Sequence, residues 1–270
     1  RGSGVKHPSM PEIINILIPI PPLPVQSEIV RILDTFTELT AELTAELLKR
    51  RVQYKYYMTL LFDNVKESDL HSIAKVCHIE KGTTPIQKAI PGKYPMVVTT
   101  TERKSCETYQ FDAKAVCIPL VSSRGHGVAS LNQVYYQEGK FALGNILCAI
   151  IPKNEEQVCS KYLYYYFQLT KEYTLVPLMK GGANVALRIN DIEKVKVPIP
   201  SLEEQSRIVS ILDKFDTLTN SISEGLPKEI ELRKKQYEYY RDMLLTFPSL
   251  RAAGEAIQKS EAIRKNNTTR

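Results

Sequence analysis

One long segment of this chain is present twice. Residues 18–40, IPIPPLPVQSEIVRILDTFTELT, return 179 positions later as residues 197–219, VPIPSLEEQSRIVSILDKFDTLT. A shorter pair, QYKYY at 53–57 and QYEYY at 236–240, is 183 positions apart, so the second copy contains four additional residues. The long unrelated stretch between the copies excludes a solenoid, whose repeats recur every 20–50 residues or so. We therefore expect a duplicated scaffold that holds a variable domain between two similar supports.

Each copy predicts one long helix, because its hydrophobic residues recur in steps of three, four or seven. The positions are 29, 33, 36, 43, 47, 54, 57 and 61 in the first copy, and 208, 212, 215, 222, 226, 230, 237, 240 and 244 in the second. Such a heptad pattern is typical of a coiled coil. A globular segment separates the two helices along the chain, so an antiparallel pair is the simplest arrangement. The four added residues form a stutter, and Gly225 with Pro227 predicts a kink or a break there.

The segment between the helices has the pattern of a mixed α/β domain. Short β-rich runs are separated by Gly, Pro and polar turns, at 94–100, 115–122, 133–136 and 146–151. Residues 160–175 predict a helix that is rich in tyrosine. We expect these tyrosines to pack in the core more than to stack on bases, because aromatic side chains bury well where elements meet.

The predicted fold class is α+β, with one mixed α/β domain flanked by two long helices that form an antiparallel coiled coil. The expected divisions are a first helical repeat at 18–63, the mixed domain at 64–197, a second helical repeat at 198–247, and a frayed or weakly helical tail at 248–270. Residues 1–17 align with the end of the mixed domain, so we expect them to be the remnant of an upstream copy. The chain also lacks an initiator Met, which is expected of the rear half or a fragment of a longer protein.

The excess positive charge is concentrated in the middle of the chain. The net charge is +6, and residues 64–190 contain 15 Lys or Arg against 10 Asp or Glu. This excess favours a domain that faces a polyanion. Neither a membrane-spanning run nor a signal peptide is visible, and the five cysteines are scattered, which predicts a cytoplasmic protein with reduced thiols.

Signatures of catalysis are missing from the sequence. An Asn-Pro-Pro-aromatic methyltransferase motif, a Gly-rich cofactor loop, a GxxxxGK[ST] phosphate loop and an HExxH zinc motif all fail to occur. The histidines at 7, 71, 78 and 126 have no acidic or cysteine partner at metal-ligand spacing. We therefore expect a chain that is not an enzyme and that holds neither a metal nor a cofactor.

The string VPIPSLEEQSRIVSILDKFDTL, preceded by a Gly-Gly turn and an Ile-Asn-Asp-Ile step, resembles the conserved region of type I restriction-modification specificity subunits. The middle segment is similar to the target recognition domains of that family at GKFALGNILCAI (139–150), at KGTTP (81–85) and at Gly181-Gly182. The resemblance covers nearly the whole chain. It is highly specific in the helical repeats and looser in the middle.

The resemblance implies a non-catalytic subunit that binds double-stranded DNA in a sequence-specific manner. Two recognition domains, spaced by two antiparallel helices, would each read half of a bipartite target. The implied partners are modification subunits, which bind S-adenosylmethionine and methylate adenine, and a restriction subunit. Only one complete recognition domain is present here, so a working unit needs a second copy or a complementary half. Two identical copies would read an inverted repeat.

Candidate DNA contacts are polar and basic residues in predicted loops of the middle domain. Arg can pair with guanine and Asn with adenine, whereas Lys and Thr mainly position the protein against phosphate. Arg124 and Lys81 are the first choices by loop context. The full set is Lys81, Thr83, Thr84, Thr100, Arg103, Lys104, Ser122, Arg124, His126, Lys180 and Asn184.

Two other functions are compatible with parts of the sequence. A truncated scaffold or recombination cassette that does not bind DNA, and that only assembles partner subunits, would explain the incomplete N-terminal copy. A fragment of a bifunctional nuclease or methylase is disfavoured by the missing motifs.

The stutter generates a prediction about target spacing. Deleting residues 226–229 brings the two helical repeats nearer to equal length, so the spacing between the two half-sites should shift, or activity on the normal spacing should be abolished. Methylation of DNA targets with spacers of graded length measures this. An unchanged spacing preference would show that the insertion is neutral.

Overall fold

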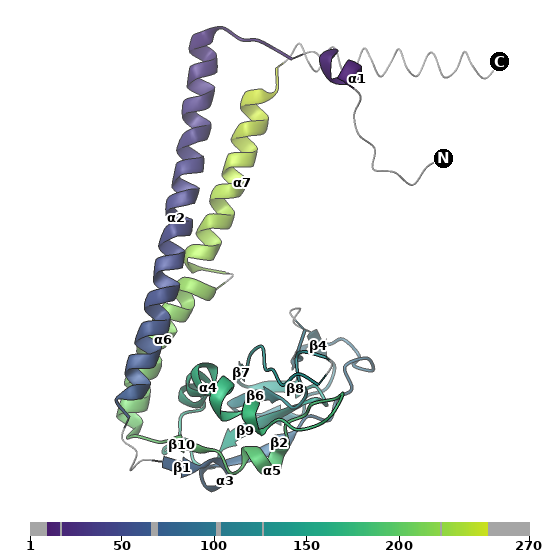
Figure 1. The fold of residues 1–270 in the computed structure, drawn as a ribbon, viewed down its shortest axis with the longest axis vertical. Helices are drawn as coiled ribbons and strands as arrows, with labels where there is room; N and C mark the ends of the chain where they lie inside the picture. The colour runs from purple at the N-terminus through teal and green to yellow at the C-terminus, as the bar shows by residue number, and fades with distance from the viewer. Residues whose placement is uncertain are drawn as a thin grey trace, which may run out of the picture. The chain divides into compact units, whose positions relative to one another are not determined.

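A computed structural model describes residues 10–16, 18–65, 70–100, 104–125, 127–221 and 223–247. The chain divides into two compact units (Figure 1). Residues 1–48 and 220–270 form one, here called the helical unit, and residues 49–219 form the other, here called the mixed unit. Helix α2 (Leu23–Asp63) contributes to both units. The expected tail lies outside the described residues.

In the helical unit, α2 packs against α7 (Gly225–Leu245) in an antiparallel pair. Phe36 stacks on Tyr240 with 5.2 Å between the ring centroids. Nearer the start of α2, Ile29 lines the same hollow as Leu245. Positions rise along one helix as they fall along the other, so the antiparallel prediction is confirmed here. A short helix, α1 (Met10–Ile14), precedes α2.

The mixed unit contains the equivalent contact between a phenylalanine and a tyrosine, but here the phenylalanine comes from the second repeat and the tyrosine from the first. Phe215 of α6 (Leu202–Asn220) lies 5.4 Å from Tyr57 of α2, measured between ring centroids. Tyr57 and Tyr240 are counterparts in the QYxYY pair, as Phe36 and Phe215 are in the longer repeat. Each repeat therefore supplies a phenylalanine to the tyrosine of the other. Arg51 of α2 also donates to the Thr219 carbonyl at 3.5 Å, so positions fall along α2 as they rise along α6, and this pair is antiparallel too.

The predicted break in the second helical repeat is confirmed. Helix α6 ends at Asn220 and α7 begins at Gly225, whose φ of 80° is favourable only for glycine. Pro227 lies in the first turn of α7, where its missing N–H has no acceptor to lose. The break therefore lies directly ahead of Gly225, within the stretch where the offset between the repeats changes from 179 to 183. Ile222, one of the predicted seam positions, lies outside the described residues.

Two four-stranded sheets form the centre of the mixed unit. The first has the order β2–β9–β6–β7 and is antiparallel throughout, whereas the second has the order β4–β3–β8–β5 and includes a parallel β3–β8 pair. The strands are β2 (Cys77–Lys81), β3 (Tyr94–Val97), β4 (Lys104–Cys106), β5 (Phe111–Asp112), β6 (Ala115–Pro119), β7 (Tyr135–Gln137), β8 (Lys140–Leu143) and β9 (Leu147–Pro152). All four predicted β-rich runs contain a strand.

A two-stranded sheet and short helices complete the mixed unit. Strand β1 (Leu70–Ser72) pairs with β10 (Lys196–Pro198) in antiparallel register. The helices are α3 (Ile73–Val76), α4 (Ser160–Thr174), the 3-10 helix η2 (Val176–Leu178) and α5 (Ile189–Ile192). The combination of mixed sheets with flanking long helices confirms the α+β fold class. Among the described residues, no helix has the length and apolar character needed to cross a membrane.

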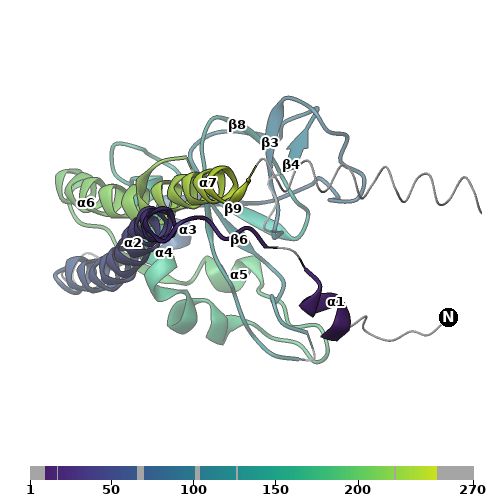
Figure 2. The same cartoon turned by 90° about the horizontal axis from the view of Figure 1, so that it is seen from above.

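The two faces of the first sheet bury different clusters. Val116 and Ile118 of β6 pack with Tyr162 of α4, whereas Cys117 packs with Phe141 of the second sheet. Figure 2 accordingly shows α4 and the β3–β4–β8 strands on opposite sides of β6 and β9. Because both faces are covered, every residue of β6 is buried. Tyr162 and Tyr165 are also buried, so the preference for tyrosine packing is confirmed for these two.

Helix α6 is fastened to the domain by one buried amide. Gln205 is 0 % exposed, and its Oε1 accepts the N–H of Cys159 at 2.8 Å, where α4 begins. Its Nε2 donates to the carbonyl oxygens of Gln157 and Pro200 at 2.9 and 2.8 Å. The amide oxygen and the amide nitrogen of this buried side chain are therefore both hydrogen-bonded, as is usual for buried polar groups.

Apolar and charged contacts extend the same junction along α6. Ile208 and Leu212 are fully buried. Asp213 accepts a hydrogen bond from the Tyr165 hydroxyl at 2.5 Å and pairs with the Lys161 ammonium at 2.8 Å. Burial is the main cause that raises the pKa of Tyr165, and the bond to Asp213 adds to it, so the phenol remains protonated.

The two repeat glutamines give a matched test of the junction. We expect Gln205→Ala to lower the free energy of unfolding of the mixed unit by about 2–4 kcal/mol, because it leaves the Cys159 N–H unpaired in a close-packed site. Gln26→Ala removes only one bond, to the Pro21 carbonyl, and should cost less than about 1 kcal/mol. Urea unfolding of both variants measures the difference, and equal losses would contradict this account of the junction.

Candidate nucleic-acid interface

The loops that carry the predicted contacts meet at one end of the first sheet. In its registers, Lys81 of β2 lies opposite Cys148, and Pro119 of β6 lies opposite Leu147. The loops after β2 and β6 and the turn before β9 therefore share an edge, which we call the loop end. Strand β7 begins at the same edge, because Tyr135 pairs with Cys117.

The second sheet adds two more candidates to the loop end. Val97, the last residue of β3, pairs with Leu143, the last residue of β8. The chain then turns at Gly144, whose N–H donates to the Val97 carbonyl at 3.0 Å, and enters β9. Thr100 follows β3, and Lys104 begins β4 opposite Met96, so both side chains belong to this edge. Figure 1 shows β1 and β10 at the other side of the domain from β4.

The segment Lys81–Pro85 is held by close backbone contacts and by Gln110. A Cβ atom on Gly82 would lie 2.2 Å from the Gly144 carbonyl oxygen, so glycine is required there. Gln110 Nε2 donates to the Lys81 carbonyl at 2.9 Å, and its Oε1 accepts both the N–H and the hydroxyl of Thr83, at 2.9 and 3.0 Å. The backbone that carries the exposed Lys81 side chain is thus held in place.

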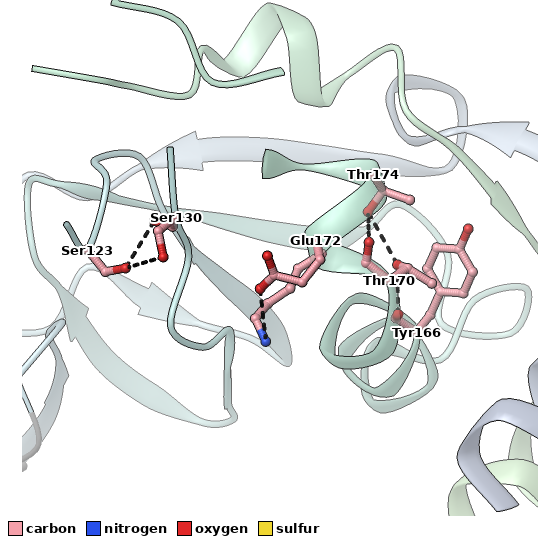
Figure 3. A network of polar contacts seen from close by, with 7 residues as sticks. Ser123, Ser130, Tyr166, Thr170, Glu172 and Thr174 are labelled. Atoms are coloured by element: carbon pink, nitrogen blue, oxygen red, sulfur yellow. Dashed lines mark hydrogen bonds and ion pairs between the residues drawn. The ribbon is translucent and has the colours of Figure 1, made fainter. Parts of the chain in front are cut away.

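Serine side chains hold the loop after β6 in shape. The Ser122 hydroxyl donates to the Val128 carbonyl at 2.5 Å and accepts the Arg124 N–H at 3.2 Å. The Ser123 hydroxyl bonds the carbonyl and the hydroxyl of Ser130, both at 3.1 Å (Figure 3). Ser122 therefore orders its own loop, while the Arg124 side chain is exposed.

The loop at 180–186 lies against the loop after β6. Lys180 and Ala186 exchange two backbone hydrogen bonds, at 2.8 and 2.9 Å, and the Ser122 N–H donates to the Val185 carbonyl at 3.0 Å. Gly181 has a φ of 146°, and a Cβ there would lie 2.2 Å from the Asn184 carbonyl oxygen. The glycine turn thus allows a tight hairpin whose Lys180 and Asn184 are exposed beside the Arg124 loop.

Two adjoining hollows lie among these loops. One, of about 160 Å³, is lined by Thr100, Lys104, Gln133, Tyr135 and Gln137 among others. The second, of about 230 Å³, shares Gln133 and Tyr135 and is also lined by Thr99, Ser122, Ser123 and Asn132. Their shared residues make them one polar groove, which runs from Lys104 to Ser122.

The structure brings most of the predicted contacts together at the loop end, but these residues differ in how exposed their side chains are. Lys81, Lys104, Arg124 and Lys180 are exposed at the loop end, and in the described ranges no carboxylate forms an ion pair with any of them. Thr84 is partly buried and forms a backbone bridge with Gly144. Arg103 and His126 lie outside the described residues.

Three amide side chains of the loop end were not predicted from the sequence. Asn132 and Gln133 line the groove, and Gln110 holds the neighbouring segment Lys81–Pro85. Gln133 was assigned to a strand, but β7 begins two residues later, at Tyr135. Adjacent Asn and Gln just before a β-rich run are the signal that could have marked this pair.

Removing the Gln110 amide should make the segment Lys81–Pro85 more mobile without unfolding the domain. We expect Gln110→Ala to raise the hydrogen-exchange rate of the Thr83 amide by about tenfold, because a bond worth roughly 1 kcal/mol no longer protects it. The Lys180 amide, which is bonded to Ala186, serves as the internal control. Equal acceleration at both amides would indicate general destabilisation.

Comparisons with known proteins agree with this architecture. Residues 1–50 and 65–232 match the family described as "Type I restriction modification DNA specificity domain". The chain is 38 % identical over 246 residues to the type I restriction enzyme EcoR124I/EcoR124II specificity subunit of Escherichia coli, covering 84 % of this chain and 60 % of that protein. It therefore spans about three fifths of the length of that relative.

A relative of similar length is also found. A putative type I specificity subunit of Mycoplasma pneumoniae is 30 % identical over 254 residues, which cover 86 % of this chain and 93 % of that protein. Among solved structures, the HsdS subunit from Thermoanaerobacter tengcongensis superposes with a TM-score of 0.54 at 19 % identity, covering 91 % of this chain and 64 % of that one. This likeness concerns the fold.

The family match covers both helical repeats and the domain between them, which are the segments on which the sequence resemblance rested. The chain is a member of the type I restriction modification DNA specificity domain family.

Proposed function

We propose that this chain is the non-catalytic specificity subunit of a type I restriction-modification methyltransferase, and that its mixed unit reads one half of a bipartite DNA target. The gathering of exposed cations and amides at one loop end carries this proposal. Its support comes from the family, whose description is DNA specificity, and from strand registers that bring five separate loops to one edge.

The side chains at the loop end suit two kinds of DNA contact. Lys81, Lys104 and Lys180 are positioned to meet phosphates, which fix the register of a protein on DNA without reading sequence. Arg124 can pair with guanine O6 and N7, and Asn132 and Gln133 can pair with adenine N6 and N7. The polar groove thus supplies base readers, and the surrounding lysines supply affinity that depends on salt.

The proposed complex also contains modification and restriction subunits. Methyl transfer to adenine, with S-adenosylmethionine, belongs to the modification subunit, and this chain contributes target choice without a cofactor of its own. The helical repeats, proposed at 18–63 and 198–247, would set the distance between half-sites and contact the modification subunits. The complex would act in the cytoplasm, where it meets DNA.

A complete bipartite target requires two recognition domains. We propose that the chain obtains the second by self-association or by pairing with another half-subunit. The competing function is a scaffold or recombination cassette that binds the partner subunits but not DNA. The exposed cations at the loop end, which have no carboxylate partner among the residues that the structure describes, favour DNA binding over this alternative, because a scaffold has no use for them.

Selection from a random DNA library tests the proposal. We expect the chain with its modification subunits to enrich one defined half-site. Lys104→Ala should weaken binding to all sequences and lower the salt slope by about one, whereas Gln133→Ala should cost about 1–3 kcal/mol at one base position and relax its specificity.

Lys194→Ala is the matched control, since Lys194 is exposed beside β10 and away from the loop end. Its half-site and salt slope should equal those of the unaltered chain. A library that shows no enrichment, while the chain still binds its modification subunits, would support the scaffold instead.

A further inference from the structure

Val121 extends one apolar face of the first sheet beyond the end of β6. Leu120 packs in the core that includes α4, as Ile118 does. Successive side chains of an extended segment point to opposite sides, so Val121 lies on the face of Cys117, which packs against the second sheet. Cys117 is 0 % exposed there, whereas Val121 is 38 % exposed. An apolar side chain therefore reaches the surface at the loop end.

Hydrogen bonds hold the backbone on both sides of Val121. The Leu120 carbonyl accepts the N–H of Leu187 at 2.8 Å, and the Ser122 N–H donates to the Val185 carbonyl at 3.0 Å. A β-branched side chain also has few χ1 rotamers. The methyl groups of Val121 are therefore presented from a fixed backbone with little freedom of their own.

Val121 shares the polar groove with two exposed amides. It lines the hollow of about 230 Å³ together with Asn132 and Gln133. The segment that carries these amides is anchored by Leu131 and Val134, which are 1 % and 2 % exposed. Within the described part of the chain, no group forms a hydrogen bond with either side-chain amide. The same hollow thus offers amide donors and acceptors together with methyl groups.

An A·T pair presents the complementary groups in the major groove of DNA. Adenine N7 and the N6 amino group can form a bidentate pair with an Asn or Gln amide, and the 5-methyl group of thymine is an apolar surface on the same edge of the pair. A G·C pair has no methyl group at this edge. An apolar side chain beside a free amide therefore suits an A·T pair better than a G·C pair.

We propose that Val121 is a specificity-determining residue of the mixed unit, and that it contacts the 5-methyl group of a thymine in the half-site. The polar groove then reads an A·T pair, the adenine through the amide of Asn132 or Gln133 and the thymine through Val121. This inference rests on the proposed function and deepens it, because it names the base pair that the groove accepts.

Val128 provides a matched comparison in the same loop. It is 45 % exposed, but it lines neither hollow of the groove. Its carbonyl accepts the Ser122 hydroxyl at 2.5 Å, and this backbone contact does not depend on the side chain at 128. Substitutions at 121 and 128 therefore remove similar apolar surface, and only the first one alters the groove.

Single replacements of thymine by deoxyuridine in the selected half-site test the contact. Deoxyuridine lacks the 5-methyl group but keeps the O4 acceptor and the pairing with adenine, so only the apolar contact is lost. With the unaltered chain and its modification subunits, we expect one replacement to weaken binding by about fourfold, which corresponds to burying one methyl group. This scan requires no variant, so a folding defect cannot imitate the result.

Serine variants of the two valines assign the contact to a residue. Val121→Ser should bind the thymine and deoxyuridine forms of that position equally, whereas Val128→Ser should keep the difference of about fourfold. Both variants should keep the salt slope of the unaltered chain, because neither substitution changes a charge. Comparing the two DNA forms within each variant cancels any general loss of affinity.

The outcomes separate this inference from the proposed function. An enriched half-site without thymine on either strand overturns the role of Val121 and leaves DNA reading by the loop end intact. The same conclusion follows if no deoxyuridine replacement weakens binding, or if Val121→Ser keeps the difference. Loss of the difference in Val128→Ser alone assigns the methyl contact to Val128 and overturns the role of Val121. The absence of any enriched half-site contradicts the proposed function itself.

Discussion

The contact between α6 and the start of α4 is the constraint on which the mixed unit depends. A fully buried amide cannot shift without leaving at least one N–H or carbonyl group unpaired, and each such loss costs about 1–3 kcal/mol. Gln205 therefore fixes where α6 passes the domain, and the buried Ile208 and Leu212 fix its rotation. The pair of Lys161 with Asp213 adds a charge contact to the same junction. Because the loop end belongs to the same sheet that α4 covers, its direction relative to α6 is set by these few side chains.

The helices could be predicted from the sequence because the signals for them are local. Apolar spacing located both long helices, and Gly225 located the break between α6 and α7. The strands within apolar runs, such as β6 and β9, were found for the same reason. Strands β1 and β10, of three residues each, were not found, since their extended form comes from pairing between segments far apart in the chain.

The candidate interface shows the same limit at the level of side chains. Glycine-flanked loops with Lys or Arg marked Lys81, Arg124 and Lys180, because turn composition is visible in sequence. The groove residue Gln133 acquires its place only when β3 and β4 bring Thr100 and Lys104 beside it. Ser122 is a predicted contact whose hydroxyl is already hydrogen-bonded to the backbone of its own loop. Composition thus identifies loops, and strand register decides which side chains are available to a ligand.

The duplication separates the part of the chain that fastens the domain from the part that carries the candidate interface. The residues of the junction, Gln205, Ile208, Leu212 and Asp213, all have identical counterparts in the first copy. None of them lies among the loops of the loop end, which belongs to the opposite edge of the first sheet from α3 and β1. Loops can therefore change without disturbing the junction, because the buried amide and the charge pair meet only α4, the residues just before it, and Pro200. A domain of this fold with different loops but the same α4 contacts would therefore keep the same attachment to α6.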